Sequence, residues 1–324
     1  MRNLLKRAFE FTSLQCRLRN PQVASQIFAS HGAPEHFQRA SGSIVLRDTG
    51  LIVNASNARL FGGAAADMRA LTSRLGVEWR PDSQGRLQAR LQNLTFEVSS
   101  AEDVFVLMEV FGIGVYALSH PEPAIVIDIG ANIGASALFF ASKPWVRHIY
   151  SFEPLKPTAK IARSNIERNA AVRDKITLSE FGLGARDETV TVEYSPEWKG
   201  KSGPAALPTD IPRSVQSWKE NIELKASSKV LPKIFDSAGG LAVVVKMDCE
   251  GGEWNILPDL AKSGLLKRID HLIFEWHERT PEPLENLLVE NGFTVARRTD
   301  ALGAKIGLIY ATNIRPRKLT ANGA

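Results

Sequence analysis

The feature that most constrains the fold of this chain is a repeated alternation of short apolar runs with helical segments, from about residue 124 to about residue 312. The runs at 124–129 and 241–248 are typical of fully buried strands, and a helical segment follows each of them. Such alternation predicts a doubly wound α/β fold, in which a mostly parallel sheet carries helices on both faces. Ligands of these sheets bind at the carboxyl ends of the central strands, so the residues that end each strand are the first candidates for a functional site.

The predicted elements follow this alternation toward the C-terminus. Strands are predicted at 124–129, 148–152, 175–178, 241–248 and 271–276, with a final pair at 293–297 and 306–312. Helices are predicted at 134–142, 157–169, 253–263 and 281–291. The run 189–194 is predicted as a further strand or hairpin arm. The segment 195–217 is rich in Gly, Pro and Ser and is predicted as a long loop, a length that is usually functional.

Weaker patterns mark the first part of the chain. They predict helices at 1–19, 64–75 and 100–116, an extended run at 46–53 and a strand at 87–96. We therefore divide the chain into a mostly helical N-terminal accessory region, 1–86, a main α/β domain, 87–315, and a C-terminal tail, 316–324.

Composition narrows the classes of partner. The net charge of the 324 residues is +5, and much of this excess lies in the first 19 residues rather than in a stripe across the fold, so we expect no nucleic-acid partner. Two cysteines permit neither a disulfide framework nor a zinc site of their own, which fits a cytoplasmic protein. Polar residues interrupt the longest apolar tract, 124–145, so no integral membrane segment is expected, while a homo-oligomer is left open.

The first predicted strand ends in the segment Asp-Ile-Gly-Ala-Asn-Ile-Gly, residues 128–134. Glycines allow a sharp turn and a close approach to a ligand, and Asn132 tolerates a left-handed conformation. The strand acid beside them fits a ligand with an amino group next to a carboxylate, as in S-adenosylmethionine, whereas the dinucleotide fingerprint has another glycine spacing. The candidate cofactor-binding residues of this segment are Asp128, Gly130, Ala131, Asn132 and Gly134.

The second strand ends in Glu153 and Pro154. An acid at this place can accept two hydrogen bonds from a ribose diol, so both residues join the candidate cofactor-binding set. A glutamate before proline is also common at a strand end that faces solvent, and this alternative stays open.

The strand 241–248 contains a lysine and runs into the acidic segment 248–253. A lysine inside an apolar strand needs a charged partner, and strand alternation places Lys246, Asp248 and Glu250 on one side. Asp248 is expected beside the reactive end of the cofactor, because this strand neighbours the first one in a doubly wound sheet.

The strand 271–276 is followed by His277, which shares a side with Glu275. An imidazole titrates near neutral pH, so His277 is a candidate general base, with a hydrogen-bonded structural histidine as the alternative. We predict Asp248, Glu250 and His277 as catalytic residues. Together with Glu253 and Glu275 these side chains also have the chemistry of a divalent-metal site; we expect no metal and leave this alternative open.

These segments together resemble the FkbM family of methyltransferases over roughly residues 87–313. The resemblance is carried by 128–134, Phe152-Glu153-Pro154, Lys246-Met247-Asp248-Cys249-Glu250-Gly251 with Glu253, Ile273-Phe274-Glu275 with His277, and Glu109-Val110-Phe111 followed by Tyr116. It implies a seven-stranded, Rossmann-like class I methyltransferase domain at 87–315 and S-adenosylmethionine as the methyl donor. It further implies transfer to a hydroxyl of a sugar, glycan or secondary metabolite.

The hypothesis for function is therefore a methyltransferase in which Asp128, Gly130 and Glu153 hold the cofactor. Asp248, Glu250 or His277 would orient or deprotonate the acceptor hydroxyl, and the loop 195–217 would close over the acceptor. Two alternatives stay open: a nicotinamide-dependent oxidoreductase on a similar sheet, and a catalytically silent methyltransferase-like scaffold.

Overall fold

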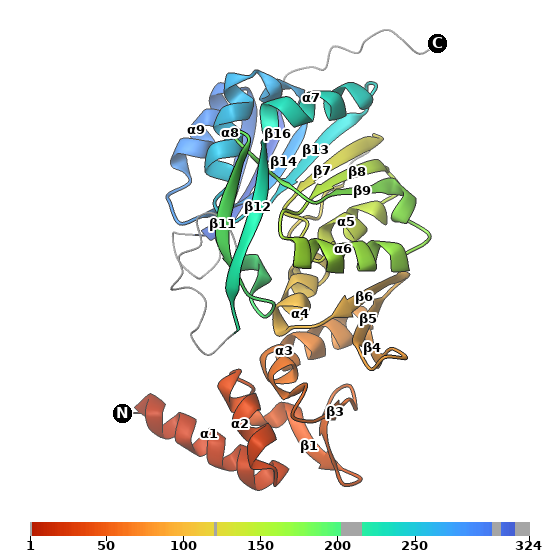
Figure 1. The fold of residues 1–324 in the computed structure, drawn as a ribbon, viewed down its shortest axis with the longest axis vertical. Helices are drawn as coiled ribbons and strands as arrows, with labels where there is room; N and C mark the ends of the chain where they lie inside the picture. Colours follow the sequence, from red (N-terminus) through yellow and green to blue (C-terminus); the bar gives the residue numbers. More distant parts are fainter. Residues whose placement is uncertain (1, 120–121, 202–215, 300–305, 315–324) are drawn as a thin grey trace. The chain divides into compact units, whose positions relative to one another are not determined.

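A computed structural model describes residues 2–119, 122–201, 216–299 and 306–314 (Figure 1). The chain forms two compact units, Met1–Gly114 and Val115–Ala324. This division falls later in the chain than residue 86, where the sequence analysis ends the accessory region. The strand predicted at 87–96 therefore belongs to the first compact unit, and the predicted tail, 316–324, lies outside the described residues.

The first unit combines helices with two small antiparallel sheets. Its long helices are α1 (Arg2–Leu18), α2 (Pro21–Ala29) and α3 (Ala58–Leu75). One sheet contains β1 (Phe37–Ala40), β2 (Ser43–Leu46) and β3 (Ile52–Val53), and the other contains β4 (Glu78–Pro81), β5 (Leu87–Leu91) and β6 (Leu94–Val98). Local chemistry sets the helix starts: the Asn20 side chain accepts a hydrogen bond from the Val23 amide, and Pro21 occupies the first position of α2.

The predicted helix at 100–116 is confirmed at its start and ends earlier than expected. Ser100 and Asp103 form a capping box at the start of α4 (Ala101–Leu107). A π-helical turn (Met108–Ile113) continues the helix, which stops at Gly114 with a φ of 72°. Gly114 adopts the left-handed conformation that commonly ends helices, and Tyr116 therefore lies beyond the helix.

A seven-stranded sheet forms the centre of the second unit, in the order β15-β16-β14-β13-β7-β8-β9. Its strands are β7 (Ala124–Ile129), β8 (Val146–Phe152), β9 (Ile176–Ser179), β13 (Ala242–Met247), β14 (His271–His277), β15 (Phe293–Thr299) and β16 (Ile306–Asn313). Neighbours from β14 to β9 pair in parallel, whereas β16 is antiparallel to both β14 and β15. The predicted doubly wound, mostly parallel sheet is confirmed.

Helices cover both faces of this sheet: α5 (Ala135–Ala141), α6 (Lys156–Arg168), α7 (Ser227–Ser237), α8 (Glu253–Lys262) and α9 (Glu282–Glu290). On one face, Ile125, Ile127 and Ile129 of β7 belong to a core that includes side chains of α7, α8 and α9. On the other face, α5 packs on β7 and β8, and α6 on β9. All residues of β7 and β13 are buried, which explains their continuous apolar sequence. Among the described residues, no helix combines the length and apolarity needed to cross a membrane.

A second, smaller sheet of this unit lies outside the main one and contains β10 (Gly182–Gly184), β12 (Trp218–Ala226) and β11 (Glu188–Tyr194). β11 pairs antiparallel with β12, so the predicted hairpin arm at 189–194 is confirmed. Neither β12 nor α7 was predicted, because β12 buries only every second residue near its end and exposes charged ones, and α7 contains Pro232. Within the predicted loop 195–217, residues 202–215 lie outside the described residues, so its closure over an acceptor stays a prediction.

Candidate functional site

The ends of the two central strands lie side by side. β7 and β13 pair in register, with Asp128 opposite Lys246 and Ile129 opposite Met247. The amide of Asp248 donates to the Ile129 carbonyl at 3.0 Å, which extends the pairing by one residue. Asp248 therefore lies level with the loop that follows β7. The predicted adjacency of the two strands is confirmed, and the place of Asp248 beside the reactive end of the cofactor stays a prediction.

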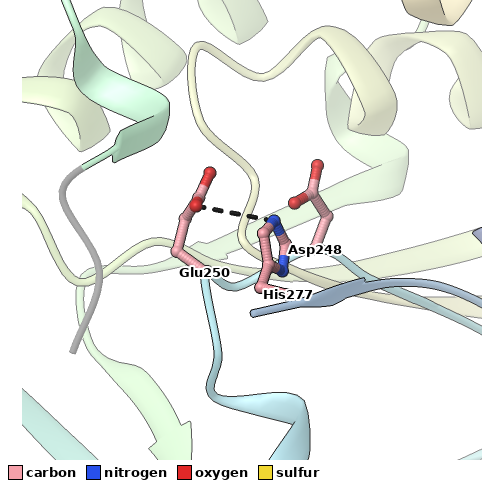
Figure 2. A group of neighbouring side chains, drawn as sticks. All are labelled: Asp248, Glu250 and His277. Atoms are coloured by element: carbon pink, nitrogen blue, oxygen red, sulfur yellow. Dashed lines mark ion pairs between the residues drawn. The ribbon is translucent and has the colours of Figure 1, made fainter. Parts of the chain in front are cut away.

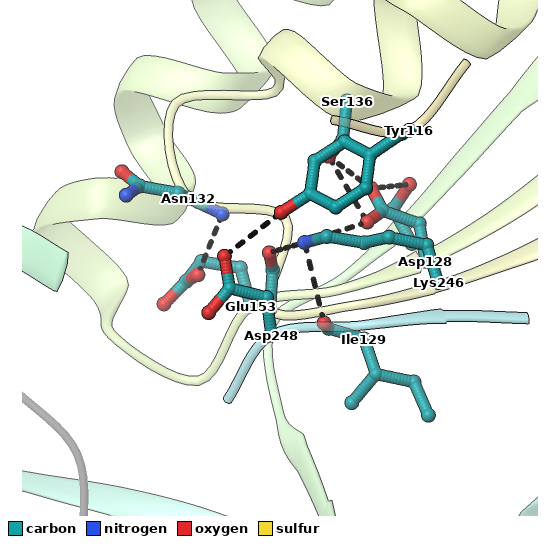
Figure 3. A network of polar contacts seen from close by, with 10 residues as sticks. Tyr116, Asp128, Ile129, Asn132, Ser136, Glu153, Lys246 and Asp248 are labelled. Carbon is teal, nitrogen blue, oxygen red and sulfur yellow. Dashed lines mark hydrogen bonds and ion pairs between the residues drawn. The ribbon is translucent and has the colours of Figure 1, made fainter. Parts of the chain in front are cut away.

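Asp128 is fully buried, and its carboxylate is surrounded by donors (Figure 3). Lys246 Nζ lies 3.2 Å from one carboxylate oxygen, and the hydroxyls of Ser136 and Ser151 donate at 3.0 and 3.1 Å. Burial lowers the pKa of Lys246, but the charges of Asp128 and Asp248 outweigh burial and raise it above its usual range. Lys246 therefore has the charged partner that its place in an apolar strand requires. Direct contact between Asp128 and a cofactor stays a prediction.

A tight loop joins β7 to α5. Gly130 has a φ of 80°, and a Cβ atom there would collide with the carbonyl oxygen of Asp248. Asn132 adopts the left-handed conformation that its residue type suggested, with a φ of 48°. Its side-chain oxygen Oδ1 is buried and accepts no hydrogen bond from the described part of the protein. An unsatisfied buried acceptor costs about 1–3 kcal/mol, so this oxygen indicates a place where a ligand or water donates.

Glu153 directly follows β8 and is 5% exposed. One carboxylate oxygen accepts the Leu155 amide at 2.9 Å. The other accepts the Asn132 amide, also at 2.9 Å (Figure 3). Burial raises the pKa of Glu153 to about 7, although these backbone hydrogen bonds partly oppose the rise. A carboxylate oxygen has two lone pairs, so each oxygen can accept one more hydrogen bond, as a diol would require.

Tyr116 is a site residue for which no functional role was predicted. Its hydroxyl donates to a carboxylate oxygen of Asp248 at 3.0 Å, and Lys246 Nζ lies 5.3 Å from the centre of its ring. The Tyr310 hydroxyl donates to the Val115 carbonyl at 2.9 Å and anchors the segment that carries Tyr116. These contacts fix the orientation of Asp248 at the sheet edge.

The predicted catalytic residues lie together. Asp248 and Glu250 follow β13, His277 ends the neighbouring strand β14, and one ligand atom of each lies within 4.8 Å of the others (Figure 2). Glu250 lies 3.5 Å from His277 Nε2 and keeps 31% of its side chain exposed, whereas the His277 side chain is 8% exposed. The cluster therefore combines a buried imidazole with a carboxylate that is partly exposed. Glu275 is not a member of this group.

Glu253, the first residue of α8, holds His277 in place. Its fully buried carboxylate accepts the amides of His277 and Gly251 at 2.8 and 2.9 Å and lies 3.3 Å from His277 Nδ1. Burial would lower the pKa of His277, but the hydrogen bond that its ring donates to Glu253 and the charges of Glu250 and Asp248 raise it to about 10. An imidazolium donates protons rather than accepting them, so the carboxylates are the candidate bases while His277 is charged.

The remaining predicted cofactor-binding residues belong to the same edge of the sheet. Gly134 precedes α5 with a φ of 83°, and Ala131 is buried within the loop. Pro154 would contact a Cβ atom at Gly182 at 3.3 Å, which places it against β10. The structure thus brings the two predicted groups, for cofactor and for catalysis, to adjoining strand ends.

Comparison with protein families gives a match to the Methyltransferase FkbM domain over residues 128–295. This match begins at Asp128 and includes Glu153, Asp248, Glu250 and His277.

Individual proteins are similar at a lower level. AMB antimetabolite synthetase AmbE of Pseudomonas aeruginosa is 25% identical over 62% of this chain, and the chain spans only 11% of its length. Methyltransferase sdnD of Sordaria araneosa is also 25% identical over 62% of this chain and is covered over 86% of its own length. Among solved structures, methyltransferase FkbM of Methylobacillus flagellatus is 15% identical with a TM-score of 0.42, and the alignment covers 80% of this chain and 62% of that protein.

Proposed function

The chain belongs to the FkbM family of methyltransferases, and from this premise we propose that it methylates a hydroxyl of a sugar, a glycan or a secondary metabolite. Family membership makes the protein a methyltransferase with S-adenosylmethionine as its methyl donor. It does not favour the oxidoreductase or the silent scaffold that the sequence left open. What we propose is the class of acceptor and the residues that bind the cofactor and the acceptor.

The residues at the sheet edge fit this cofactor. The buried Asn132 Oδ1 has no donor among the residues that the structure describes, and the Glu153 carboxylate can accept two further hydrogen bonds. The ribose hydroxyls and the amino group of the cofactor are donors. We assign Glu153 to the ribose diol and the loop 130–134 to the amino-acid end. The full proposed binding set is Asp128, Gly130, Ala131, Asn132, Gly134, Glu153, Pro154 and Asp248.

The observation that carries the proposal is the grouping of Asp248, Glu250 and His277 next to this binding edge. When bound, the cofactor supplies a methyl group that is already electrophilic, because its sulfur is a sulfonium. Transfer forms a bond from the acceptor oxygen to the methyl carbon and leaves the electron pair of the broken C–S bond on sulfur. The chain must orient the hydroxyl and take its proton, and the three side chains supply both functions.

Labelled cofactor tests the proposal directly. The protein is incubated with methyl-labelled S-adenosylmethionine and fractionated extracts of carbohydrates, small metabolites and nucleic acids. We expect label in a carbohydrate or metabolite fraction, in an ether linkage that survives mild alkali. Label in nucleic acid, or in an alkali-labile ester, would overturn the assignment to a hydroxyl.

A variant tests the role of the cluster. His277→Ala is expected to lower turnover by about 10²-fold or more, the lower end of what a positioned proton-transfer group contributes. Glu275→Gln is the matched control, because Glu275 lies on the same strand outside the group. Turnover of His277→Ala within a few-fold of the wild type would remove His277 from the catalytic set.

A further inference from the structure

The cluster of Asp248, Glu250 and His277 has the composition and spacing of a metal-binding group. One carboxylate oxygen or ring nitrogen from each lies within 4.8 Å of the others, and the side chains point into one space (Figure 2). Two ligands that bind one ion at about 2.1 Å lie about 3.0–3.5 Å apart. Glu250 and His277 Nε2 already have this separation, at 3.5 Å. Small side-chain rotations would bring Asp248 to the same distance.

The orientation of His277 is an independent sign of a ligand at this place. Nδ1 of His277 lies 3.3 Å from the buried carboxylate of Glu253, which can only accept, so the proton on this side belongs to Nδ1. Nε2 is thereby directed toward Glu250. Histidines that bind metals almost always donate their second ring N–H to a carboxylate or carbonyl in this way.

The charges around the imidazole also favour a cation. Three carboxylates, those of Asp248, Glu250 and Glu253, surround one ring. Lys246 makes its direct contacts with other groups, since its ammonium lies 3.2 Å from Asp128 and donates to the Gly130 carbonyl, and it acts on Asp248 only through its charge. Without a metal, the imidazolium of His277 supplies one positive charge to these carboxylates. A divalent ion that replaces the proton on Nε2 would supply two.

We propose that Asp248, Glu250 and His277 bind one divalent transition-metal ion, with Glu253 as the residue that orients His277. An imidazole beside two carboxylates suits Mn²⁺, Fe²⁺ or Zn²⁺ better than Mg²⁺, which prefers oxygen ligands. Three protein ligands leave positions open on the ion, and the partly exposed Asp248 and Glu250 lie on its open side. These positions bind and orient the acceptor oxygen. This role rests on the proposed function, whereas binding of the ion does not.

Binding of Mn²⁺ to the full chain, followed through the electron paramagnetic resonance signal of the free ion, tests the site. After removal of metals with a chelator, the wild type is expected to bind one Mn²⁺ per chain. Glu250→Gln and His277→Ala are each expected to weaken binding at least about tenfold, and Glu253→Gln about 10–100-fold. Glu275→Gln is the control and is expected to bind as the wild type does. Glu250→Gln changes a partly exposed side chain and should not affect folding, so the test holds even if a substitution of the buried His277 or Glu253 destabilises the protein.

Two outcomes overturn the inference: absence of stoichiometric binding at millimolar Mn²⁺, or wild-type affinity in both Glu250→Gln and His277→Ala. Calorimetry with S-adenosylhomocysteine on the same samples separates this result from failure of the proposed function. One result would be that the protein binds this compound and methylates a hydroxyl with undiminished turnover in chelator, but does not bind Mn²⁺. The proposed function would then hold without the metal site. A protein that binds Mn²⁺ through these residues and methylates no hydroxyl has the site without the function.

Discussion

Asp128 and Asp248 end neighbouring strands, and both were predicted to contact the cofactor, yet their surroundings differ. Asp128 has no exposed surface and accepts from Lys246 and two serine hydroxyls. Asp248 is partly exposed, and the Tyr116 hydroxyl donates to it. The comparison teaches that an acid at a strand end can either organise the sheet edge or face a ligand, and that its partners decide between the two roles.

The largest expected effect concerns the buried acid. Asp128→Asn leaves Lys246 as an unpaired buried charge, and breaking such a pair costs about 3–5 kcal/mol of the free energy of unfolding. Urea unfolding of the variant and the wild type measures this difference. A loss below about 1 kcal/mol would contradict the structural role assigned to Asp128.

The double variant Asp128→Asn with Lys246→Met sharpens this test, because it removes both charges. We expect it to recover much of the lost stability, since replacing both members of a buried ion pair by uncharged groups often changes the free energy of unfolding very little. If the double variant is as unstable as the single one, the ion pair is not the cause of the loss.

Asp248 is expected to show the opposite pattern. Asp248→Asn keeps the shape of the side chain and its bond from Tyr116, so stability should change by less than about 1 kcal/mol. Turnover should fall about 10²-fold, because we propose that this carboxylate contacts the acceptor and the cofactor. Steady-state kinetics alongside urea unfolding decides the matter. Equal losses of stability in Asp128→Asn and Asp248→Asn would remove the contrast between the two acids.

Tyr116 connects the partly exposed Asp248 to the segment that Tyr310 anchors in the second unit. Tyr116→Phe removes one hydrogen bond to a charged group, worth about 1.5–2 kcal/mol, and is expected to lower kcat about 10- to 30-fold. The KM for the acceptor should change less, since Tyr116 acts through Asp248. Tyr310→Phe is the control, because it removes a hydroxyl that holds the same segment without touching Asp248.

The main sheet and much of the site could be predicted, because their signals are local. Continuous apolar runs such as those of β7 and β13 follow from burial on both faces, and the acids and glycines that end them stand beside them in sequence. The registers then bring Asp128 beside Lys246 and Asp248 beside the loop after β7. Strand order and strand ends together therefore located the candidate site.

The rest depends on contacts between distant segments. Tyr116 meets Asp248 across 132 positions of sequence, and no spacing rule connects them. Ser136 and Ser151 are ordinary helix and strand residues until the fold places them on Asp128. β12 escaped prediction because its buried apolar residues come only near its end and alternate there with polar or charged ones. Sequence types and periods locate a site of this kind, but they do not show which donors satisfy each of its acids.

Glu153 provides a comparison with both aspartates, since it is buried like Asp128 but has room for further donors like Asp248. Its pKa is raised from 4.5 to about 7, so the folded protein holds a proton there that the unfolded chain has lost. The stability of the cofactor-free protein is therefore expected to decrease as pH rises from about 4.5 to 7. Ribose hydroxyls donate to the ionised carboxylate, so affinity for S-adenosylhomocysteine should change the other way and rise about tenfold between pH 6 and pH 8.

Calorimetry in buffers with different ionisation enthalpies measures the proton that Glu153 releases on binding. Near pH 6 the wild type is expected to release close to one proton per bound ligand, and near pH 8 almost none. Glu153→Gln cannot release this proton, so its affinity should be weaker and nearly flat over the same range. If the variant kept the full pH dependence of the wild type, another group would carry it, and Glu153 would be a second buried structural acid like Asp128.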